Sequence, residues 1–251
     1  MSHHKLDAKD LYYAYPGGNK AIDGITFHIS HGEAVGIVGA NGAGKSTLLM
    51  LLMGLLFPDS GSICVGDVTL TPKTLPLIRR HLGMILQNPD DQLFMPTVYE
   101  DVAFGPRNMK LDEKEVDHCV QQALELMGIS HLSNRPPYRL SGGEKRAAAI
   151  AAVMAMSPDL LIMDEPTAHL DPRARRRIME IIKGFEHTRI IASHDMDMIL
   201  ELCPRTIVLR SGRVAADGET KAILTNQQLL EDCDLEMPLS LQNCPVCGRS
   251  K

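Results

Sequence analysis

The stretch Gly39-Ala40-Asn41-Gly42-Ala43-Gly44-Lys45-Ser46 decides the fold of this chain, because it fits the pattern G-x-x-x-x-G-K-[ST]. The apolar run Ala34–Val38 before it predicts a buried strand, and Thr47–Met53 after it predicts a helix. Glycines let successive backbone N–H groups turn toward one anion, and the helix start adds partial positive charge. The pattern therefore predicts a loop that binds the phosphates of a nucleoside triphosphate.

Two side chains at the end of this loop carry most of its predicted chemistry. Lys45 is placed to reach the β- and γ-phosphates, and the Ser46 hydroxyl is placed to ligate Mg²⁺. A glycine loop arising by chance is the plain alternative, but the strand before it and the helix after it argue against chance. By itself, the loop predicts only nucleotide binding.

A second glycine motif lies in Leu140–Arg146, where Ser141-Gly142-Gly143 is followed by Glu144. Ser141 is placed to cap a helix that begins at Gly142 or Gly143, and Glu144 to complete a capping box. Such an ordinary helix start is also an anion site, because a helix N-terminus carries partial positive charge. One nucleotide rarely needs two phosphate sites in one chain. The pair predicts two chains that face each other, each clamping the nucleotide held by the other.

Acidic side chains end another apolar run, Leu160–Met163, as Asp164 and Glu165. Asp164 is suited to hold Mg²⁺ through water, and Glu165 is suited to polarise the water that attacks a phosphoanhydride. A solvated loop pair is the alternative. His194 ends the strand-like run Ile190–Ser193, although a lone histidine is more often structural than catalytic. Gln87 follows a further apolar run, Leu82–Leu86.

Together, these motifs resemble those of the ATP-binding-cassette (ABC) ATPases. Ser141-Gly142-Gly143 resembles the signature motif, with Glu144 where glutamine is common, and Asp164-Glu165 resembles the Walker B motif. The resemblance makes His194 the switch histidine, which contacts the γ-phosphate. It makes Gln87 the Q-loop glutamine, which touches Mg²⁺ and water and links nucleotide state to the neighbouring subdomain.

Two further stretches extend the resemblance. Tyr15 resembles the aromatic residue that stacks on adenine; the alternative is an edge-strand tyrosine, but a rigid ring suits stacking on any purine. Ala168–Asp171 resembles the D-loop that crosses the dimer interface, with His169 where a small residue is common.

The resemblance implies a complete set of site residues. The expected ATP-binding residues are Tyr15, Gly39, Ala40, Asn41, Gly42, Ala43, Gly44, Lys45, Ser46, Thr47 and Gln87. The expected contacts to the nucleotide of the facing chain are Ser141, Gly142, Gly143 and Glu144. The expected Mg²⁺ residues are Ser46, Gln87 and Asp164, and the expected catalytic residues are Glu165 and His194.

Composition narrows the class of protein. The net charge is −5 and aromatic residues make up 4% with no tryptophan, so a nucleic-acid partner is not expected. The basic cluster Arg173–Arg177 is more often a solvated helix face. No apolar run approaches the ~20 residues that span a bilayer, and the N-terminus lacks the apolar core of a signal peptide. We expect a peripheral protein on the cytoplasmic face of the cell membrane, held there by a partner.

The order of motifs predicts an α/β fold, a P-loop NTPase ABC cassette with an antiparallel β subdomain at about 6–29 and an inserted helical subdomain at about 88–156. Within the insert, Glu113–Met127 places apolar residues on one helical stripe: Val116, Val120, Ala123, Leu124 and Met127. The ABC ATPase domain is expected over residues 1–225, and 226–251 is expected to be a C-terminal tail.

Cysteine use predicts a reducing compartment, with Cys64, Cys119 and Cys203 as packed residues. The tail contains a CxxC pair, Cys244 and Cys247, which would supply two ligands to Zn²⁺. A tetrahedral site needs two more, so a tail with reduced thiols is favoured, and bridging of Zn²⁺ between two chains stays open.

The segment from Gln87 to Pro106 is similar to that of the energy-coupling-factor (ECF) importer ATPases, most of all the cobalt and nickel branch. The similar residues are Asp91-Gln92-Leu93-Phe94, Pro96-Thr97-Val98 and Glu100-Asp101-Val102-Ala103-Phe104-Gly105-Pro106, together with Asp164-Glu165-Pro166-Thr167. The resemblance covers about 6–218.

The same segment predicts a docking surface for a membrane subunit. Leu93, Phe94 and Met95 are expected to form an exposed apolar cluster, rimmed by acidic side chains: Asp90, Asp91, Glu100 and Asp101. The alternative is a folded loop satisfied within the subdomain.

The function implied by the resemblance is ATP binding and hydrolysis that powers an ECF-type importer for cobalt or nickel ions. The partners implied are a transmembrane T component, a substrate-binding S component and a second ABC ATPase chain, identical or paralogous. The alternatives are the ATPase of another ABC transporter or of a vitamin-type ECF importer, and a soluble non-transport ABC ATPase. The last would need a coiled-coil insertion, tandem cassettes or basic nucleic-acid surfaces, and none is visible.

Overall fold

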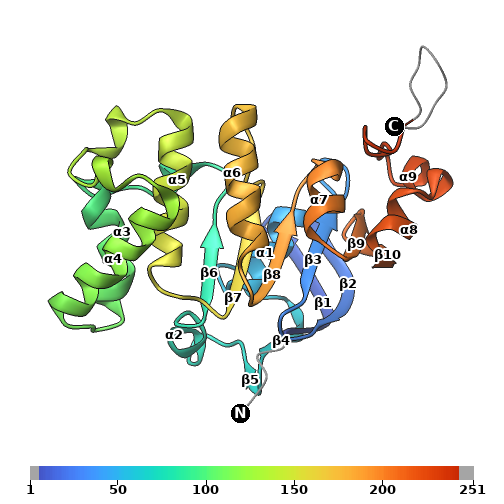
Figure 1. Ribbon diagram of the computed structural model, residues 1–251. Helices are drawn as coiled ribbons and strands as arrows, with labels where there is room; N and C mark the ends of the chain where they lie inside the picture. Colours follow the sequence, from blue (N-terminus) through green and yellow to red (C-terminus); the bar gives the residue numbers. More distant parts are fainter. Residues whose placement is uncertain (1–5, 243–251) are drawn as a thin grey trace. The chain divides into compact units, whose positions relative to one another are not determined.

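Residues 6–242 are described by the structure, a computed structural model, and they belong to two compact units (Figure 1). The first unit combines the two ends of the chain, Met1–Ile78 and Thr188–Lys251. The second unit is Arg79–His187. Within the described range, no helix combines the length and apolarity needed to cross a membrane.

An antiparallel sheet forms the N-terminal part of the first unit, with strand order β2-β1-β4-β5. Its strands are β1 (Leu6–Tyr15), β2 (Asn19–Ile29), β4 (Ser60–Val65) and β5 (Val68–Thr69). Leu6, Ala8 and Leu11 of β1 are buried, while the polar residues between them face outward. The predicted antiparallel edge at about 6–29 is therefore present.

A second group of strands in the first unit carries the glycine loop. β3 (Ala34–Val38) is parallel to both β8 (Thr188–Ala192) and β9 (Arg205–Arg210), and β10 (Arg213–Glu219) pairs antiparallel with β9. All five residues of β3 are buried, as the apolar run predicts. The helices of this unit are α1 (Lys45–Leu52), α2 (Leu75–Ile78), α7 (Met196–Leu202), α8 (Thr220–Leu224) and α9 (Gln227–Asp232).

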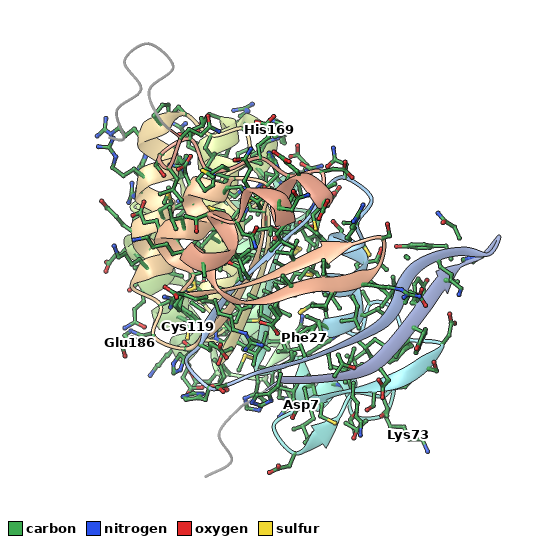
Figure 2. All side chains as sticks on the ribbon, turned by 90° about the vertical axis from the view of Figure 1, so that its right-hand side faces the viewer. Asp7, Phe27, Lys73, Cys119, His169 and Glu186 are labelled. Atoms are coloured by element: carbon green, nitrogen blue, oxygen red, sulfur yellow. The ribbon has the colours of Figure 1, made fainter. Side chains whose placement is uncertain are left out.

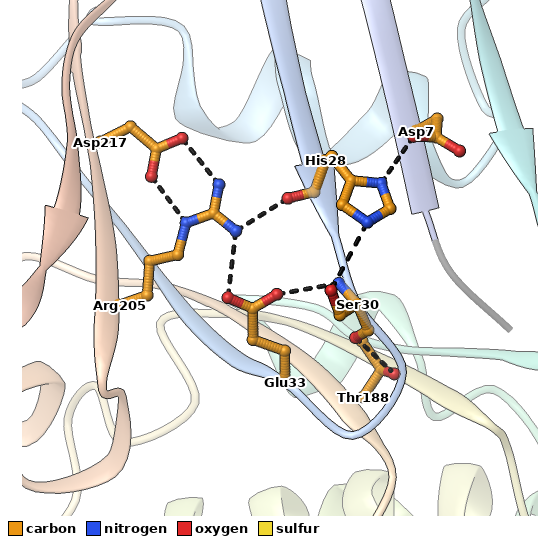
Figure 3. Close-up of polar contacts among 7 residues, drawn as sticks. All are labelled: Asp7, His28, Ser30, Glu33, Thr188, Arg205 and Asp217. Atoms are coloured by element: carbon orange, nitrogen blue, oxygen red, sulfur yellow. Dashed lines mark hydrogen bonds and ion pairs between the residues drawn. The ribbon is translucent and has the colours of Figure 1, made fainter. Parts of the chain in front are cut away.

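A polar cluster centred on Arg205 connects several strands of this unit (Figure 3). The guanidinium donates to both carboxylate oxygens of Asp217 (2.6 and 2.7 Å), to Glu33 (3.0 Å) and to the carbonyl of His28 (2.8 Å). Glu33 in turn accepts from the backbone N–H of Ser30 at 2.8 Å. The cluster thus joins β2, the turn before β3, β9 and β10.

The second unit contains two parallel strands and four longer helices. β6 (Leu82–Ile85) pairs with β7 (Leu160–Asp164), and the helices are α3 (Val98–Asn108), α4 (Glu113–Met127), α5 (Gly142–Met154) and α6 (Pro172–Lys183). Three 3₁₀ turns connect them: η1 (Pro89–Asp91), η2 (Ser130–Leu132) and η3 (Pro137–Arg139). α3, α4 and α5 pack against one another within the insert, as the helical pattern predicts.

α4 shows how a local sequence pattern is sufficient to predict a helix. The helix begins after Asp112, which forms a capping box with Glu115, and it ends at Gly128 in the left-handed conformation. Its buried residues are the predicted stripe: Val116, Val120, Ala123, Leu124 and Met127. Caps at both ends and one apolar stripe therefore account for the helix.

Candidate nucleotide site

The glycine loop joins the end of β3 to the start of α1. Gly44 adopts a φ of +105°, and a Cβ added there would lie 2.7 Å from the carbonyl oxygen of Ala21. At Gly39 a Cβ would lie 2.5 Å from the carbonyl oxygen of Leu209. Larger side chains are excluded at both positions by this close backbone approach. A Cβ at Gly42, in contrast, would meet no atom within 4 Å, so the loop is open on one side.

The Lys45 side chain lies over the loop that it follows. Its ammonium donates to the carbonyl of Gly39 at 2.6 Å and to that of Ala40 at 3.2 Å. Ser46 is exposed in the first turn of α1, while Thr47 is buried. One ammonium and the amides of a helix N-terminus therefore lie at the open side of a loop with little side-chain bulk. This arrangement fits an anionic phosphate group.

Tyr15 lies beside the first turn of α1. Its hydroxyl is 3.2 Å from the hydroxyl of Thr47, and its ring packs edge to face with Tyr13 at a centroid distance of 5.1 Å. The residue remains 38% exposed. The structure thus brings two predicted ATP-binding residues together, and stacking of the ring on adenine stays a prediction.

His194 follows β8 and shares a cavity with the glycine loop. The preceding Ser193 N–H donates to Ile37 of β3 at 3.2 Å. The cavity has a volume of about 540 Å³ and is lined by Gly39–Asn41, His194–Asp197 and Asp234–Leu239. The predicted switch histidine therefore lies near the start of the phosphate loop.

The C-terminal part of that cavity wall was not found from the sequence. The carboxylate of Asp197 accepts from the backbone N–H groups of Leu239 (3.1 Å) and Ser240 (3.0 Å), which holds the segment after α9 beside the histidine. No motif marks this segment, because the contact joins an ordinary helix-start aspartate to backbone amides.

The second unit holds the remaining predicted residues. Asp164 is the last residue of β7 and Glu165 follows it; both are buried, at 7% and 6% exposure. Glu165 has a φ of +49°, in the left-handed region that a glutamate rarely adopts. Strained backbone of this kind is concentrated at functional sites, where the surrounding structure holds it in place.

The signature segment forms the predicted capping box at the start of α5. The Ser141 hydroxyl accepts from the Glu144 N–H at 3.4 Å, and the Glu144 carboxylate accepts from the Ser141 N–H and hydroxyl, both at 2.8 Å. The Ser141 N–H, followed by its hydroxyl, lowers the pKa of Glu144. A Cβ at Gly142 would meet no atom within 4 Å, so this helix start is also open.

A second cavity, of about 380 Å³, brings the Q-loop, signature and D-loop segments together. Its lining includes Gln87, Gly142 and Ala168–Leu170. His169 of the D-loop is exposed, with a φ of +61° (Figure 2). The second unit therefore presents three of the predicted motifs around one hollow.

The predicted docking cluster needs two corrections. Leu93 is 7% exposed, so it is a core residue and not part of a surface. Asp101 is 4% exposed and its carboxylate accepts from the N–H groups of Phe94 (2.9 Å) and Met95 (3.0 Å), so it caps the chain from inside and is no rim charge. Burial raises the pKa of Asp101, and the two backbone donors oppose that effect.

Phe94 instead pairs with Phe104, which lies in the same segment but was not included in the predicted docking cluster. Phe94 is 64% exposed and Phe104 is 43% exposed, and their rings meet edge to face at 5.0 Å. Phe104 lies within α3, and Phe94 lies in the segment before that helix. A pair of large exposed aromatic side chains is the kind of surface that contacts a partner.

The residues that would hold Mg²⁺ have the right chemistry. Ser46 offers a hydroxyl in the first unit, and Gln87 and Asp164 offer an amide and a carboxylate oxygen in the second. Mg²⁺ prefers oxygen ligands and is commonly held by one or two protein groups together with substrate phosphates and water. Among residues 6–242, no group of three or more His, Cys, Asp or Glu is arranged to hold a metal ion. Cys244 and Cys247 lie outside the described residues.

The fold and these motifs define an ATP-binding-cassette ATPase. The sequence model of the ABC transporter family matches residues 22–168, and the chain belongs to that family. An ABC transporter ATP-binding protein of Geobacter sulfurreducens is 60% identical over 99% of this chain and 100% of its own length. The energy-coupling factor transporter ATP-binding protein EcfA of Carboxydothermus hydrogenoformans is 44% identical over 93% of this chain and 87% of its own length.

Solved structures agree with these relatives. cbiO1 from Clostridium perfringens, part of the ABC transporter complex cbiONQ, has a TM-score of 0.80 and 39% identity, covering 92% of this chain and 94% of its own. A dimeric ATP-binding cassette in a post-hydrolysis state with ADP and Pi has a TM-score of 0.78 and 26% identity, covering 86% and 98%. The predicted fold class and the resemblance to ECF-type ATPases are confirmed, and the chain is an ATP hydrolase of the transporter type.

Proposed function

We propose that this chain is the ATPase subunit of an ECF-type importer for cobalt or nickel ions, and that it works at the cytoplasmic face of the cell membrane. Its partners are a transmembrane T component, an S component that binds the substrate, and a second ABC ATPase chain, identical or paralogous. The observation that carries the proposal is the exposed Phe94–Phe104 pair, which lies in the segment whose sequence is similar to that of ECF ATPases. The likeness to EcfA and to cbiO1 supports the same assignment.

The mechanism begins with two cassettes that enclose two ATP molecules. In each site, Lys45 and the amides of the glycine loop bind the β- and γ-phosphates, and Tyr15 stacks on the base. The facing chain supplies Ser141, Gly142 and its open helix start to the γ-phosphate. Ser46, Gln87 and Asp164 would hold Mg²⁺, which would supply positive charge next to the phosphates.

Hydrolysis then reverses the closure. Glu165 orients and deprotonates the attacking water, and His194 contacts the γ-phosphate. Loss of the γ-phosphate removes the group that bridges the two chains, so the closed state is no longer favoured and they separate. The docking surfaces of the two cassettes move together and apart during this cycle, and the attached membrane subunit moves with them.

The docking step depends on an aromatic anchor. Phe94→Ala should release the membrane subunit, because a buried aromatic anchor is worth about 2 kcal/mol or more at an interface. The glycine loop belongs to the other unit, so the ATP affinity of the isolated cassette should change little. The measurement is co-purification of the T component with each variant, alongside nucleotide affinity.

Controls distinguish the possible outcomes. Leu126→Ala removes another half-exposed apolar side chain of the same unit, at 47% exposure, and should leave the complex intact. Charge reversal at Asp91 should slow assembly and increase its salt sensitivity. If Phe94→Ala retains both the complex and substrate uptake, this surface is not the docking site. Uptake of radioactive cobalt or nickel, against a vitamin substrate, separates this proposal from a vitamin-type importer.

A further inference from the structure

Arg146 is a buried charged residue that the mechanism above does not use. It lies on α5, five residues after the signature serine, and is 2% exposed. Its two terminal nitrogens donate to the carbonyl oxygens of Leu86 and Gln87. Burial lowers the pKa of Arg146, and the nearby charge of Asp164 opposes that effect. Burying a guanidinium costs free energy unless the charge is paired and hydrogen-bonded, so the position of Arg146 requires an explanation.

Further contacts attach the same segment to α5. Lys145 donates to Asp90 at 2.6 Å, and the Gln92 side-chain amide donates to the Ala149 carbonyl at 2.9 Å. The amide oxygen of Gln92 also accepts from the Leu86 N–H at 3.3 Å. Residues 86–92 are therefore held at both ends and in the middle by one helix. Of these contacts, only those of Arg146 reach the backbone of Gln87 itself.

The hydrogen bonding of the buried Arg146 guanidinium is incomplete. Within the described residues, its Nε has no hydrogen-bond partner. Arg146 also lines the cavity of about 380 Å³ that Gln87 and Gly142 share. A methionine would fill the same volume without a buried donor left unpaired. The two hydrogen bonds to carbonyl oxygens are therefore what arginine provides at this position and an apolar side chain would not.

We propose that Arg146 is a positioning residue that makes the backbone of Gln87 follow the signature helix. The Q-loop glutamine and the signature serine then move together, because one helix carries Ser141 and holds Gln87. A displacement at the docking surface would reach both groups at once. This inference rests on the proposed role of Gln87 in the nucleotide site.

The first test is a double-mutant cycle in the dimeric ATPase, with its membrane subunits. Arg146→Lys keeps the charge but replaces the two terminal nitrogens of a planar guanidinium by a single ammonium, which does not reproduce the same pair of bonds. The variant should lower kcat on the order of ten- to a hundredfold with little change in KM for ATP. In a Gln87→Ala background the same change should lower kcat almost no further, because the Gln87 side chain, through which Arg146 is proposed to act, is already absent. Additive losses would show that Arg146 does not act through Gln87.

The second test reads the backbone directly. Amide hydrogen exchange of the full chain should rise in residues 86–92 of Arg146→Lys and stay unchanged in α5 and α4. A uniform rise through the unit would mean that Arg146 only stabilises the fold, and no rise would mean that it does not hold the segment. Arg146→Gln, which retains one donor, is measured in the same way if the lysine variant does not fold.

A matched control replaces a guanidinium of the other unit that also donates several hydrogen bonds, including one to a backbone carbonyl. Arg205→Lys should lower stability but show no coupling to Gln87→Ala. The outcomes also separate this inference from the proposed function. If Gln87→Ala alone leaves ATPase activity normal, the role of Gln87 fails, whereas the exchange experiment still decides whether Arg146 holds the segment.

Discussion

At the scale of single residues, Glu165 combines three properties that a hydrolytic base requires. It directly follows a buried strand, it is only 6% exposed, and its backbone is held at a φ of +49°. The rigid strand before it fixes its Cα, and the left-handed turn redirects the chain immediately after β7. Burial excludes competing water, while the fixed backbone limits where the carboxylate can lie.

Glu165→Gln should abolish turnover while ATP binding is retained. Gln has nearly the same shape but cannot accept a proton, and loss of a positioned base costs on the order of 10²–10⁴ in rate. ATP should then accumulate in a closed dimer, which size-exclusion chromatography with ATP would detect. Glu165→Gly serves as a control, because it relieves the positive φ but also lacks the carboxylate. Near-normal steady-state ATPase activity in Glu165→Gln would remove this residue from the role.

Asp101 provides a prediction for pH dependence. Burial raises its pKa above the ordinary value of 3.8, so the folded protein holds this proton more tightly than the unfolded chain does. The free energy of unfolding therefore loses a contribution as pH rises from about the unfolded pKa through the folded one. Asp101→Asn lacks this titration and keeps an oxygen that can accept from the N–H groups of Phe94 and Met95.

The expected result is that Asp101→Asn gains stability relative to the wild type between pH 4 and pH 7, as measured by urea unfolding. Asp101→Ala is the control, because it leaves two backbone donors unpaired and should cost about 1–3 kcal/mol at either pH. A wild type that gains stability relative to Asp101→Asn as pH rises would show that the pKa is lowered, not raised.

At the scale of elements, the start of α5 forms a helix cap, and we propose that the same atoms also bind an anion. The capping box between Ser141 and Glu144 satisfies the end of the helix. The open space at Gly142 leaves the neighbouring amides accessible to an anion from outside the chain. The local sequence fully specifies the helix cap, whereas the proposed anion contact requires a facing chain.

Ser141→Asp separates the helix cap from the proposed anion contact. Aspartate is a good helix cap, so the fold should be retained, but its negative charge would face the γ-phosphate of the other chain. ATP-dependent dimerisation should fail while ATP binding to the monomer is unchanged, as measured by analytical ultracentrifugation and nucleotide titration. Ser141→Thr retains both the cap and the neutral hydroxyl, and should dimerise. Equal dimerisation of the aspartate variant and the wild type would contradict the two-chain site.

At the scale of the whole molecule, stability of the first unit draws on residues far apart in sequence. The Arg205 cluster joins Asp217, Glu33 and the His28 carbonyl through one guanidinium (Figure 3). The hydrogen bonds that Arg205 donates to Asp217 raise the pKa of the guanidinium, so its charge is constant over any accessible pH. The cluster therefore acts as a permanent connection between the two chain ends that form this unit.

Arg205→Met should lower the free energy of unfolding by about 1–3 kcal/mol, because two partly buried carboxylates and a carbonyl lose a charged donor. Arg213→Met is the matched control: Arg213 also makes two bonds to one carboxylate, that of Asp23, but its side chain is 70% exposed. Water replaces those bonds readily, so a much smaller loss is expected. Equal losses in the two variants would mean that burial of the cluster contributes nothing.

The sequence alone was enough for features that depend on neighbours along the chain. The strand Ala34–Val38, the helix Glu113–Met127 and the capping box at Ser141 follow from apolar period, cap chemistry and glycine sterics, and all three are present. The motif order also predicted the family, because phosphate binding constrains residue types within short stretches. The roles of individual site residues stay predictions.

Only the tertiary structure decided which side chains are exposed and which distant groups meet. Leu93 and Asp101 are buried by packing within their unit, although their local sequence resembles a surface. Arg146 reaches Gln87, and residues near Leu239 reach the His194 cavity, through contacts that no local pattern encodes. The physical reason is that burial and long-range hydrogen bonds depend on how elements pack, whereas period, caps and glycine conformations are set within a few residues.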